Sequence, residues 1–431
     1  MLLRTLTLFK IWRLGLGVTR RYRNIMLLML AAVVFAMTWH CSEAYGGELS
    51  IKPAITLREE FDDNIFLTQN NKVDDFITRV IPSVAIAYKT PIWDLMLADT
   101  FQWWYYAKQD RGFYSNDGNL ASKLIVINNL VYFDVTDTYS SVVLNPRGPS
   151  TTSNLNVNRT DANVLNAVPY IKYQINPTTA ATIGGTYTNI WYRGGGGVNR
   201  EEYKGFVTLG HTFSARFNAL LGGEYLADRP EGQRSDNDQT AAFTSLFFTL
   251  DPKTRFDGTV GYRWIRFTEG PDHNSPIYNV GLAYQFVEKG QVQLRASQLF
   301  STSPTQGIVK NTAQQLTASY GESFSINGGI YHTRDFYFEI GQTNDAVGGT
   351  VGLIYTPTSR LAYRISGRYE KDNFLPQHQK RDVYGGSAGI DYKLTAKATL
   401  SITDDYNKST GQIETDNFTD NIVGLQLRIE F

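Results

Sequence analysis

The chain has 431 residues with 41 basic and 41 acidic side chains, and hydrophobic residues make up 42% of it. That content is too polar for a bundle of membrane-spanning helices. The one cysteine, Cys41, excludes a disulfide framework, a thiolate metal site and covalent haem attachment.

The first 44 residues have the organisation of a secretory signal peptide. Six basic residues and no acid precede an apolar run at 25–39, which is shorter than the roughly 20 residues of a membrane-spanning helix. Ser42 and Ala44 supply the small residues of a cleavage site, so we predict a leader over 1–44 and one mature domain over 45–431. The long basic segment leaves an internal start at Met26 open. Removal of the leader takes away six bases and one acid, and the resulting net charge of 35 − 40 = −5 argues against nucleic acid as a partner.

The mature sequence alternates between apolar and polar residues over long runs. In residues 361–370, Leu361, Tyr363 and Ile365 fall on one face of a strand, and Arg364 and Arg368 fall on the other. Many such runs reach 10–14 residues, whereas strands of soluble sandwiches average about 5–6. This length favours membrane-spanning strands over a soluble sandwich.

The predicted connections between these runs alternate between short turns and longer polar loops. Nine short turns, including one at 135–138, and ten loops, including 62–75, 107–119 and 145–160, give nineteen connections. Short turns on one rim and long loops on the other are typical of outer-membrane barrels. We predict an all-β, up-and-down antiparallel transmembrane β-barrel of about 20 strands, with 18 as the alternative.

Aromatic residues gather where predicted strands meet the long loops. Their rings prefer the headgroup level of a bilayer, so we predict an outer aromatic girdle. A sugar-stacking platform is the alternative for the run 103–106. The predicted girdle comprises Trp103, Trp104, Tyr105, Tyr106, Trp191, Tyr192, Trp264 and Tyr369.

The motifs of catalysis and metal binding are weak. The run of four glycines at 194–197 lacks the Lys-Ser/Thr of a phosphate loop. His332 and Asp335 lie close together, which leaves a membrane hydrolase as a remote alternative. The acidic groups at 62–64 and 404–405 could bind calcium at a rim, but such pairs are usually just solvated and neither matches a calcium loop. We therefore expect no enzyme, no metal and no cofactor.

The stretch 424–431 alternates strictly and ends in an aromatic residue. Leu425, Leu427, Ile429 and Phe431 share one face, which predicts a last strand that pairs with the first and closes the barrel. The pattern also resembles the C-terminal signal that the barrel insertion machinery reads in bacterial outer-membrane proteins. An edge strand of a soluble sandwich is the alternative.

The face opposite the apolar one would line the lumen. Arginines on that face favour anions or acidic glycans, unless they pair with acids on adjacent strands. The lumen candidates are Arg263, Arg295, Arg364, Arg368, Arg428, Glu224, Glu370, Asp391 and Glu430.

The region 57–84 resembles a family of porin-like outer-membrane β-barrel proteins associated with exopolysaccharide and exosortase loci. The resemblance rests on residues 59–65, which read Glu-Glu-Phe-Asp-Asp-Asn-Ile, on Asp74-Asp75-Phe76 and on Ile81-Pro82-Ser83. It implies a Gram-negative outer membrane, contact with its lipid, and transport of polar solute or export of exopolysaccharide, with periplasmic polysaccharide-export proteins as partners. The alternative is a structural barrel that sheaths a periplasmic partner such as a multihaem cytochrome.

Overall fold

The computed structural model describes residues 47–146, 148–151, 154, 157–232 and 235–431. The predicted signal peptide, with Ser42 and Ala44, lies outside the described residues. Residues 49–431 form one compact unit. No helix in the described part of the chain is long and apolar enough to cross a membrane.

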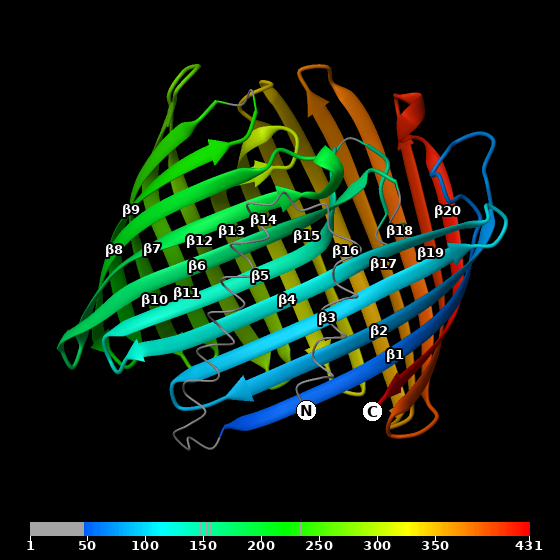
Figure 1. Cartoon of the computed structure of the whole chain (residues 1–431), viewed down its shortest axis with the longest axis horizontal. Helices are drawn as coiled ribbons and strands as arrows, with labels where there is room; N and C mark the ends of the chain where they lie inside the picture. The colour runs from blue at the N-terminus through cyan, green and yellow to red at the C-terminus, as the bar shows by residue number, and fades with distance from the viewer. Residues whose placement is uncertain (1–46, 147, 152–153, 155–156, 233–234) are drawn as a thin grey trace, which may run out of the picture. The chain divides into compact units, whose positions relative to one another are not determined.

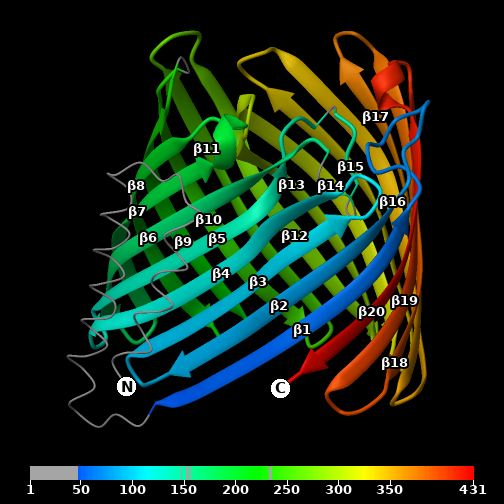
Figure 2. The same cartoon turned by 45° about the vertical axis from the view of Figure 1, so that its right-hand side comes forward.

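The described unit is a closed antiparallel β-barrel of 20 strands (Figure 1, Figure 2). This confirms the predicted fold class and the number 20 over 18. Two short 3₁₀ helices, η2 (Arg193–Gly195) and η3 (Glu414–Asp416), lie in connections. The strands are β1 (Glu48–Asp62), β2 (Asp75–Lys89), β3 (Trp93–Tyr106), β4 (Arg111–Ile127), β5 (Val131–Val143), β6 (Arg159–Asn176), β7 (Thr179–Tyr192), β8 (Arg200–Ser214), β9 (Phe217–Pro230), β10 (Asn237–Asp251), β11 (Thr254–Phe267), β12 (His273–Val287), β13 (Gly290–Ser303), β14 (Gly307–Gly321), β15 (Phe324–Tyr337), β16 (Gln342–Thr358), β17 (Leu361–Leu375), β18 (Gln379–Lys393), β19 (Ala398–Gly411) and β20 (Phe418–Glu430).

The barrel closes where β1 meets β20, and we call this junction the seam. Register runs from Ala54↔Glu430 to Asp62↔Ile422, and the backbone N–H of Phe431 donates to the carbonyl of Pro53 at 3.1 Å. Closure removes the two unpaired edges that an open sheet would present to lipid. The terminal strand therefore has the pairing that its alternating sequence predicts.

Alternation sorts each strand into an outward and an inward face. On β20, Val423 and Leu425 are exposed on the outside, whereas Asp420 and Ile422 are fully buried on the inside. Leu427, Ile429 and Phe431 share the outward parity of Leu425. The outer surface is therefore apolar, as lipid contact requires.

The connections on the rim that holds the C-terminal end are all short, and those on the other rim run from three residues at 304–306 to fifteen at 144–158 (Figure 1). By the usual rule for such barrels, the short-turn rim faces the periplasm and the other rim, here called the mouth, faces outward.

Two predicted connections were wrong. The turn predicted at 135–138 lies inside β5, and the true turn is 128–130, where Asn129 adopts a positive φ of 59°. The loop predicted at 107–119 shrinks to 107–110, because residues 111–119 extend β4. Polar side chains misled both predictions, since Asp137 is held within the strand by the Asn163 amide at 2.8 Å.

Candidate functional site

The inner wall of the barrel is lined by ion pairs. Of the five arginines predicted to face the lumen, four have an acidic partner. Arg263 pairs with Glu224, Arg295 with Asp257 at 3.0 Å, Arg364 with Asp391 at 2.8 Å and Arg428 with Glu430 at 3.1 Å. The sequence left open pairing with acids on adjacent strands, and only Arg364 with Asp391 has that arrangement. Arg263 and Arg295 reach acids two strands away, and Arg428 pairs within β20.

Arg368 differs from the other four. Arg368 points inward like Arg364, because the two residues are four positions apart on β17. Its side chain is exposed and forms no ion pair within 4 Å among the residues that the structure describes. Its neighbour Glu370 accepts a hydrogen bond of 2.6 Å from the hydroxyl of Tyr331. Arg368 is therefore the predicted lumen arginine whose charge is left for a solute.

Four further ion pairs, formed by three acids of the inner wall, lie closer to the mouth, and the sequence did not single them out as lumen pairs. Glu60 lies between Arg58 at 2.6 Å and Arg79 at 2.5 Å, Arg200 binds Asp228 at 3.0 Å, and Arg381 binds Asp372 at 2.8 Å. The acid of each pair is almost fully buried. Charges that are buried this deeply need such partners, so removal of one member of a pair would leave an uncompensated charge in the wall near the mouth.

The predicted aromatic girdle divides between the two faces of the wall. Trp103, Trp264 and Tyr369 are exposed on the outer surface, and Tyr105 and Trp191 share the outward parity of their strands. The predicted position in the outer girdle is wrong for Trp104, Tyr106 and Tyr192, because these residues are buried on the inner face.

The inward rings hold connections of the mouth in place. Trp104 and Tyr106 pack with Ile65 of the β1–β2 connection and with Ile77, while Tyr192 packs with Ala162 and Ile190. An aromatic ring next to a long loop can therefore pack against that loop on the inner face instead of lying at the headgroup level on the outer face. Packing by Ile65 also leaves Trp104 and Tyr106 unavailable as a sugar-stacking platform.

The first two mouth connections are tied together by acids of the region that carries the family resemblance. The fully buried carboxylate of Asp75 accepts the backbone N–H groups of Lys108 at 2.8 Å and Gln109 at 3.1 Å. The ammonium of Lys108 pairs with Asp74 and holds the pKa of that exposed carboxyl below its usual range.

The connection at residues 144–158, between β5 and β6, reaches segments around the mouth that are far away in the strand order. The carbonyl of Leu144 accepts from Thr305 Oγ1 at 2.9 Å, and the carbonyl of Pro146 accepts from Arg381 at 3.3 Å. The Asn154 amide donates to the carbonyl of Ile65 at 2.8 Å. Because these partners come from the β13–β14 connection, β18 and the β1–β2 connection, the described residues of this connection lie across the mouth.

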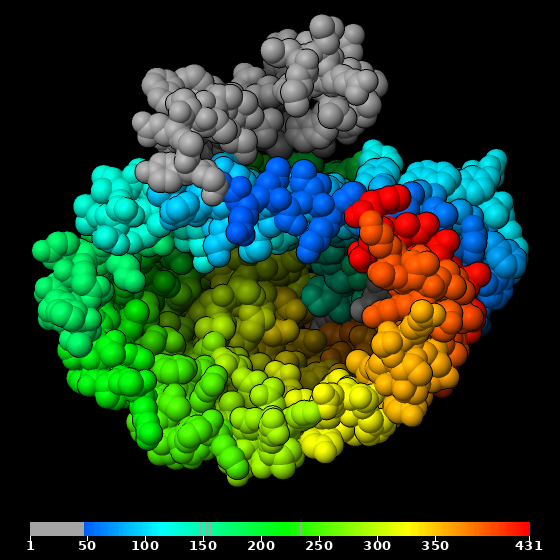
Figure 3. Space-filling view, turned by 90° about the horizontal axis from the view of Figure 1, so that it is seen from below, coloured from blue at the N-terminus to red at the C-terminus, as the bar shows by residue number. Residues whose placement is uncertain are grey.

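The barrel interior is open from the periplasmic side. Seen from below, the wall surrounds a deep hollow (Figure 3). The far end of this hollow is where residues 144–158 lie, since Pro146 meets inward residues of β15–β17, among them Tyr337 and Phe374. The arrangement is a wide vestibule that narrows at the mouth.

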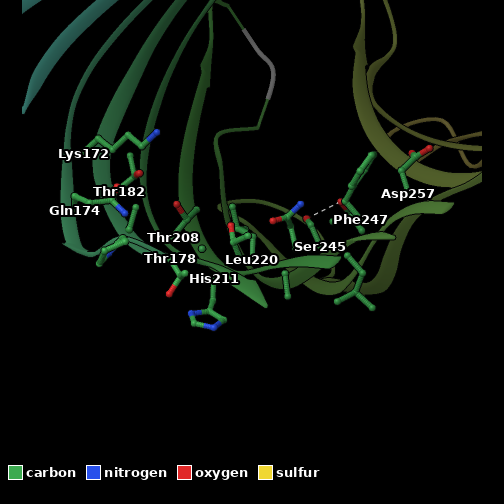
Figure 4. Close-up of a pocket in the computed structure, with 18 residues that line it drawn as sticks. Lys172, Gln174, Thr178, Thr182, Thr208, His211, Leu220, Ser245, Phe247 and Asp257 are labelled. Atoms are coloured by element: carbon green, nitrogen blue, oxygen red, sulfur yellow. Dashed lines mark hydrogen bonds between the residues drawn. The ribbon is translucent and has the colours of Figure 1, made fainter. Parts of the chain in front are cut away.

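A second hollow, of about 590 Å³, indents the inner wall near the periplasmic rim. Figure 4 shows Lys172, Thr182, Thr208 and Asp257 among its lining residues, which come from β6, β7, β8 and β11. Hydroxyl, amide and ammonium groups line it together with the Phe247 ring, so it offers both hydrogen bonds and an apolar surface to a polar solute.

The proximity of His332 and Asp335, which left a hydrolase as a remote alternative, is not a side-chain pairing in the structure. His332 Nε2 lies 2.6 Å from Asp345, on the adjacent strand β16, and its pairing with Asp335 is wrong. Asp335 has the opposite parity and accepts a hydrogen bond from the Asn311 amide. Residues three apart on a strand point to opposite faces, which explains the difference.

No family model and no curated protein matches the sequence of this chain. Among solved structures, the chain is similar to the FrpB iron transporter from Neisseria meningitidis (F5-1 variant), with a TM-score of 0.51 and 8% identity over 88% of this chain and 82% of that one. It is equally similar to a mutant of the ferric enterobactin receptor PfeA from Pseudomonas aeruginosa, with a TM-score of 0.51 and 8% identity over 89% and 80%. At this identity the likeness concerns the fold, and the chain is an outer-membrane β-barrel protein of the bacterial cell envelope.

Proposed function

We propose that this protein is a passive outer-membrane channel for polar solutes, of the porin type and without enzymatic activity. The observation that carries the proposal is a polar hollow whose wall is lined by ion pairs. This hollow is open on the periplasmic side, and the described residues of 144–158 narrow it at the mouth. A narrowing held by contacts with distant parts of the mouth sets a size limit without moving parts.

The first test is reconstitution of the purified barrel into planar bilayers and into liposomes. We expect stepwise ion conductance, and swelling rates that fall as the sugar in the bath becomes larger. Absence of both conductance and swelling from correctly folded protein would refute the channel.

The second test concerns the narrowing itself. Asn154→Ala combined with Thr305→Ala removes two of the ties that hold residues 144–158. We expect higher conductance and passage of larger sugars. Gln412→Ala is the matched control, because it removes one hydrogen bond, to the Lys380 N–H, from a connection of the same rim. Equal conductance in the double variant and the wild type would show that the narrowing lies elsewhere.

Charge selectivity should be weak. Four of the five predicted lumen arginines are neutralised by acids of the wall, so the anion preference expected from their number does not follow. Arg368 remains as the source of a small preference for anions.

Exopolysaccharide export is a second candidate. The hollow near the periplasmic rim favours it, because hydroxyl and amide groups beside the ring of Phe247 suit a sugar arriving from the periplasm. Block of conductance by oligosaccharides added to the periplasmic side only, and its loss in Phe247→Ala, would support this function and the export partners that it requires.

The sheath for a periplasmic protein is less well supported. Such a barrel needs a lumen that stays clear along its length, whereas residues 144–158 lie across one end. A partner could enter only from the periplasmic side, and a conducting barrel without any partner would argue against it.

A further inference from the structure

Three aspartates meet at the mouth end of the seam. Asp62 is the last residue of β1, Asp63 follows it, and Asp420 lies near the start of β20. One carboxylate oxygen of each lies within 4.8 Å of the others. Asp62 is 2% exposed and Asp420 is 0% exposed, so two of the three charges are removed from water.

Among the described residues, no cation, N–H or hydroxyl group contacts either carboxylate oxygen of Asp420, and its side-chain neighbour is the carboxyl of Asp62. Both oxygens are buried, and neither accepts a hydrogen bond. An isolated buried carboxylate is costly, and a second carboxylate beside it adds repulsion. Two species relieve such a cluster, namely a cation held between the carboxylates or a proton shared by them.

The other two carboxylates are already fixed by the backbone. Asp62 accepts the N–H of Asn64 at 2.8 Å, and Asp63 accepts the N–H of Asn421 at 2.7 Å. Asn64 in turn donates to the carbonyl of Thr419 at 2.8 Å, so both sides of the seam are braced beside the cluster. The positions of the oxygens are therefore set by the fold.

The nearest cation of the protein balances only part of this charge. Lys72 lies 3.8 Å from Asp63, and both side chains are about one-third exposed. Arg58, further down β1, is engaged by Glu60 at 2.6 Å. One ammonium at the exposed edge of three carboxylates leaves the buried pair unbalanced.

We propose that Asp62, Asp63 and Asp420 form a calcium site that joins the first and last strands of the barrel. The donors are all carboxylate oxygens, which hard divalent cations prefer. Calcium accepts irregular oxygen cages completed by water, whereas magnesium demands near-ideal octahedral geometry. Calcium would reach the site past the partly exposed Asp63. The bound ion would link β1 to β20 at the seam.

Sequence alone could not reveal this site. Asp62 and Asp63 form an ordinary acidic pair that matches no calcium loop, and the third ligand follows 420 − 63 = 357 residues later. Closure of the barrel brings them together, so the expectation of no metal is replaced by this proposal.

The test uses the full barrel, refolded in detergent without lipopolysaccharide and stripped with a chelator. Calorimetric titration with calcium chloride should show one ion per barrel, and calcium should raise the temperature of barrel unfolding. Magnesium chloride, titrated in parallel, should bind at least about tenfold more weakly.

Asp420→Asn should lose calcium binding and the calcium-dependent rise in unfolding temperature. In chelator it should fold at least as well as the wild type, because it removes the repulsion between buried carboxylates. Asp63→Asn provides a second variant at a partly exposed position, with calcium binding weakened about tenfold or more. Asp272→Asn removes an exposed carboxylate from the β11–β12 connection of the same rim and should behave as the wild type.

Two results would overturn the proposal. One is a wild type that binds no calcium while its stability responds to pH through the Asp62 and Asp420 pair, which would identify a shared proton. The other is calcium binding by Asp420→Asn equal to that of the wild type. Neither result depends on conductance, so the channel proposal would stand or fall separately.

Discussion

The buried ion pair between Arg200 and Asp228 gives a quantitative test of how the inner wall is stabilised. Their side chains are 2% and 1% exposed and lie 3.0 Å apart, and Asp228 also accepts from the Asn237 amide at 2.9 Å. Asp228→Ala leaves the guanidinium buried without its partner, and loss of one member of such a pair costs about 3–5 kcal/mol. Glu202 still interacts with Arg200, so we expect the lower end, about 3 kcal/mol.

Urea unfolding of the refolded barrel, followed by tryptophan fluorescence, measures this loss. The double variant Arg200→Met with Asp228→Leu replaces the pair by apolar side chains and should lie within about 1 kcal/mol of the wild type or above it. Arg266→Ala is the matched control, because Arg266 is 82% exposed and lies 3.9 Å from Asp272, so its loss should cost less than about 1 kcal/mol. A loss in Asp228→Ala no larger than that of the control would refute the reasoning.

Three further predictions concern the pore, the seam and the leader. Arg368→Ala should reduce any anion preference measured from reversal potentials in a salt gradient, whereas Arg364→Ala combined with Asp391→Ala, which removes a neutralised pair, should leave it unchanged; equal effects would contradict the special status of Arg368. Leu427→Asp with Ile429→Asp should prevent assembly, since a charge on the lipid face costs up to roughly 2–4 kcal/mol at the midplane and less for Asp; normal amounts of heat-modifiable barrel in the outer membrane would count against it. Intact mass of the exported protein should place its first residue at position 45, and retention of residues 1–44 would rule out the predicted cleavage.

The fold could be predicted because period-two alternation is a local property. Leu425 and Leu427 share a face in any strand, and a strand that fits a bilayer must pair both edges. The number of strands was predicted by counting connections, and the misplacement of one turn did not change that number. Asp134, Thr136 and Asp137 have the composition of a turn, but the left-handed conformation falls on Asn129, a residue type that tolerates it.

The face to which an individual side chain points could be predicted only where all residues on that face share the same surroundings. Trp103 and Trp104 are adjacent and so must point to opposite sides, yet both were assigned to the girdle. What decides the outcome for Trp104 is Ile65, which belongs to another connection and covers it. The partners of Arg295 and Arg263 lie two strands away, on β11 and β9, and could not be predicted for the same reason, since register is a property of paired strands and not of either sequence.

The mouth shows why function in this barrel is harder to predict than fold. Residues 144–158 have no regular secondary structure among the positions that the structure describes, and their place is set by Arg381, Thr305 and the Ile65 carbonyl, which come from three separate parts of the chain. Two of these contacts end on backbone carbonyls of the connection itself, so they constrain its path while demanding little of its side chains. Apart from Asn154, its sequence can therefore change while the narrowing persists, and its other side chains remain available to determine which solute passes. A wall fixed by ion pairs and a connection fixed through its backbone thus separate the stability of the barrel from the selectivity of its pore.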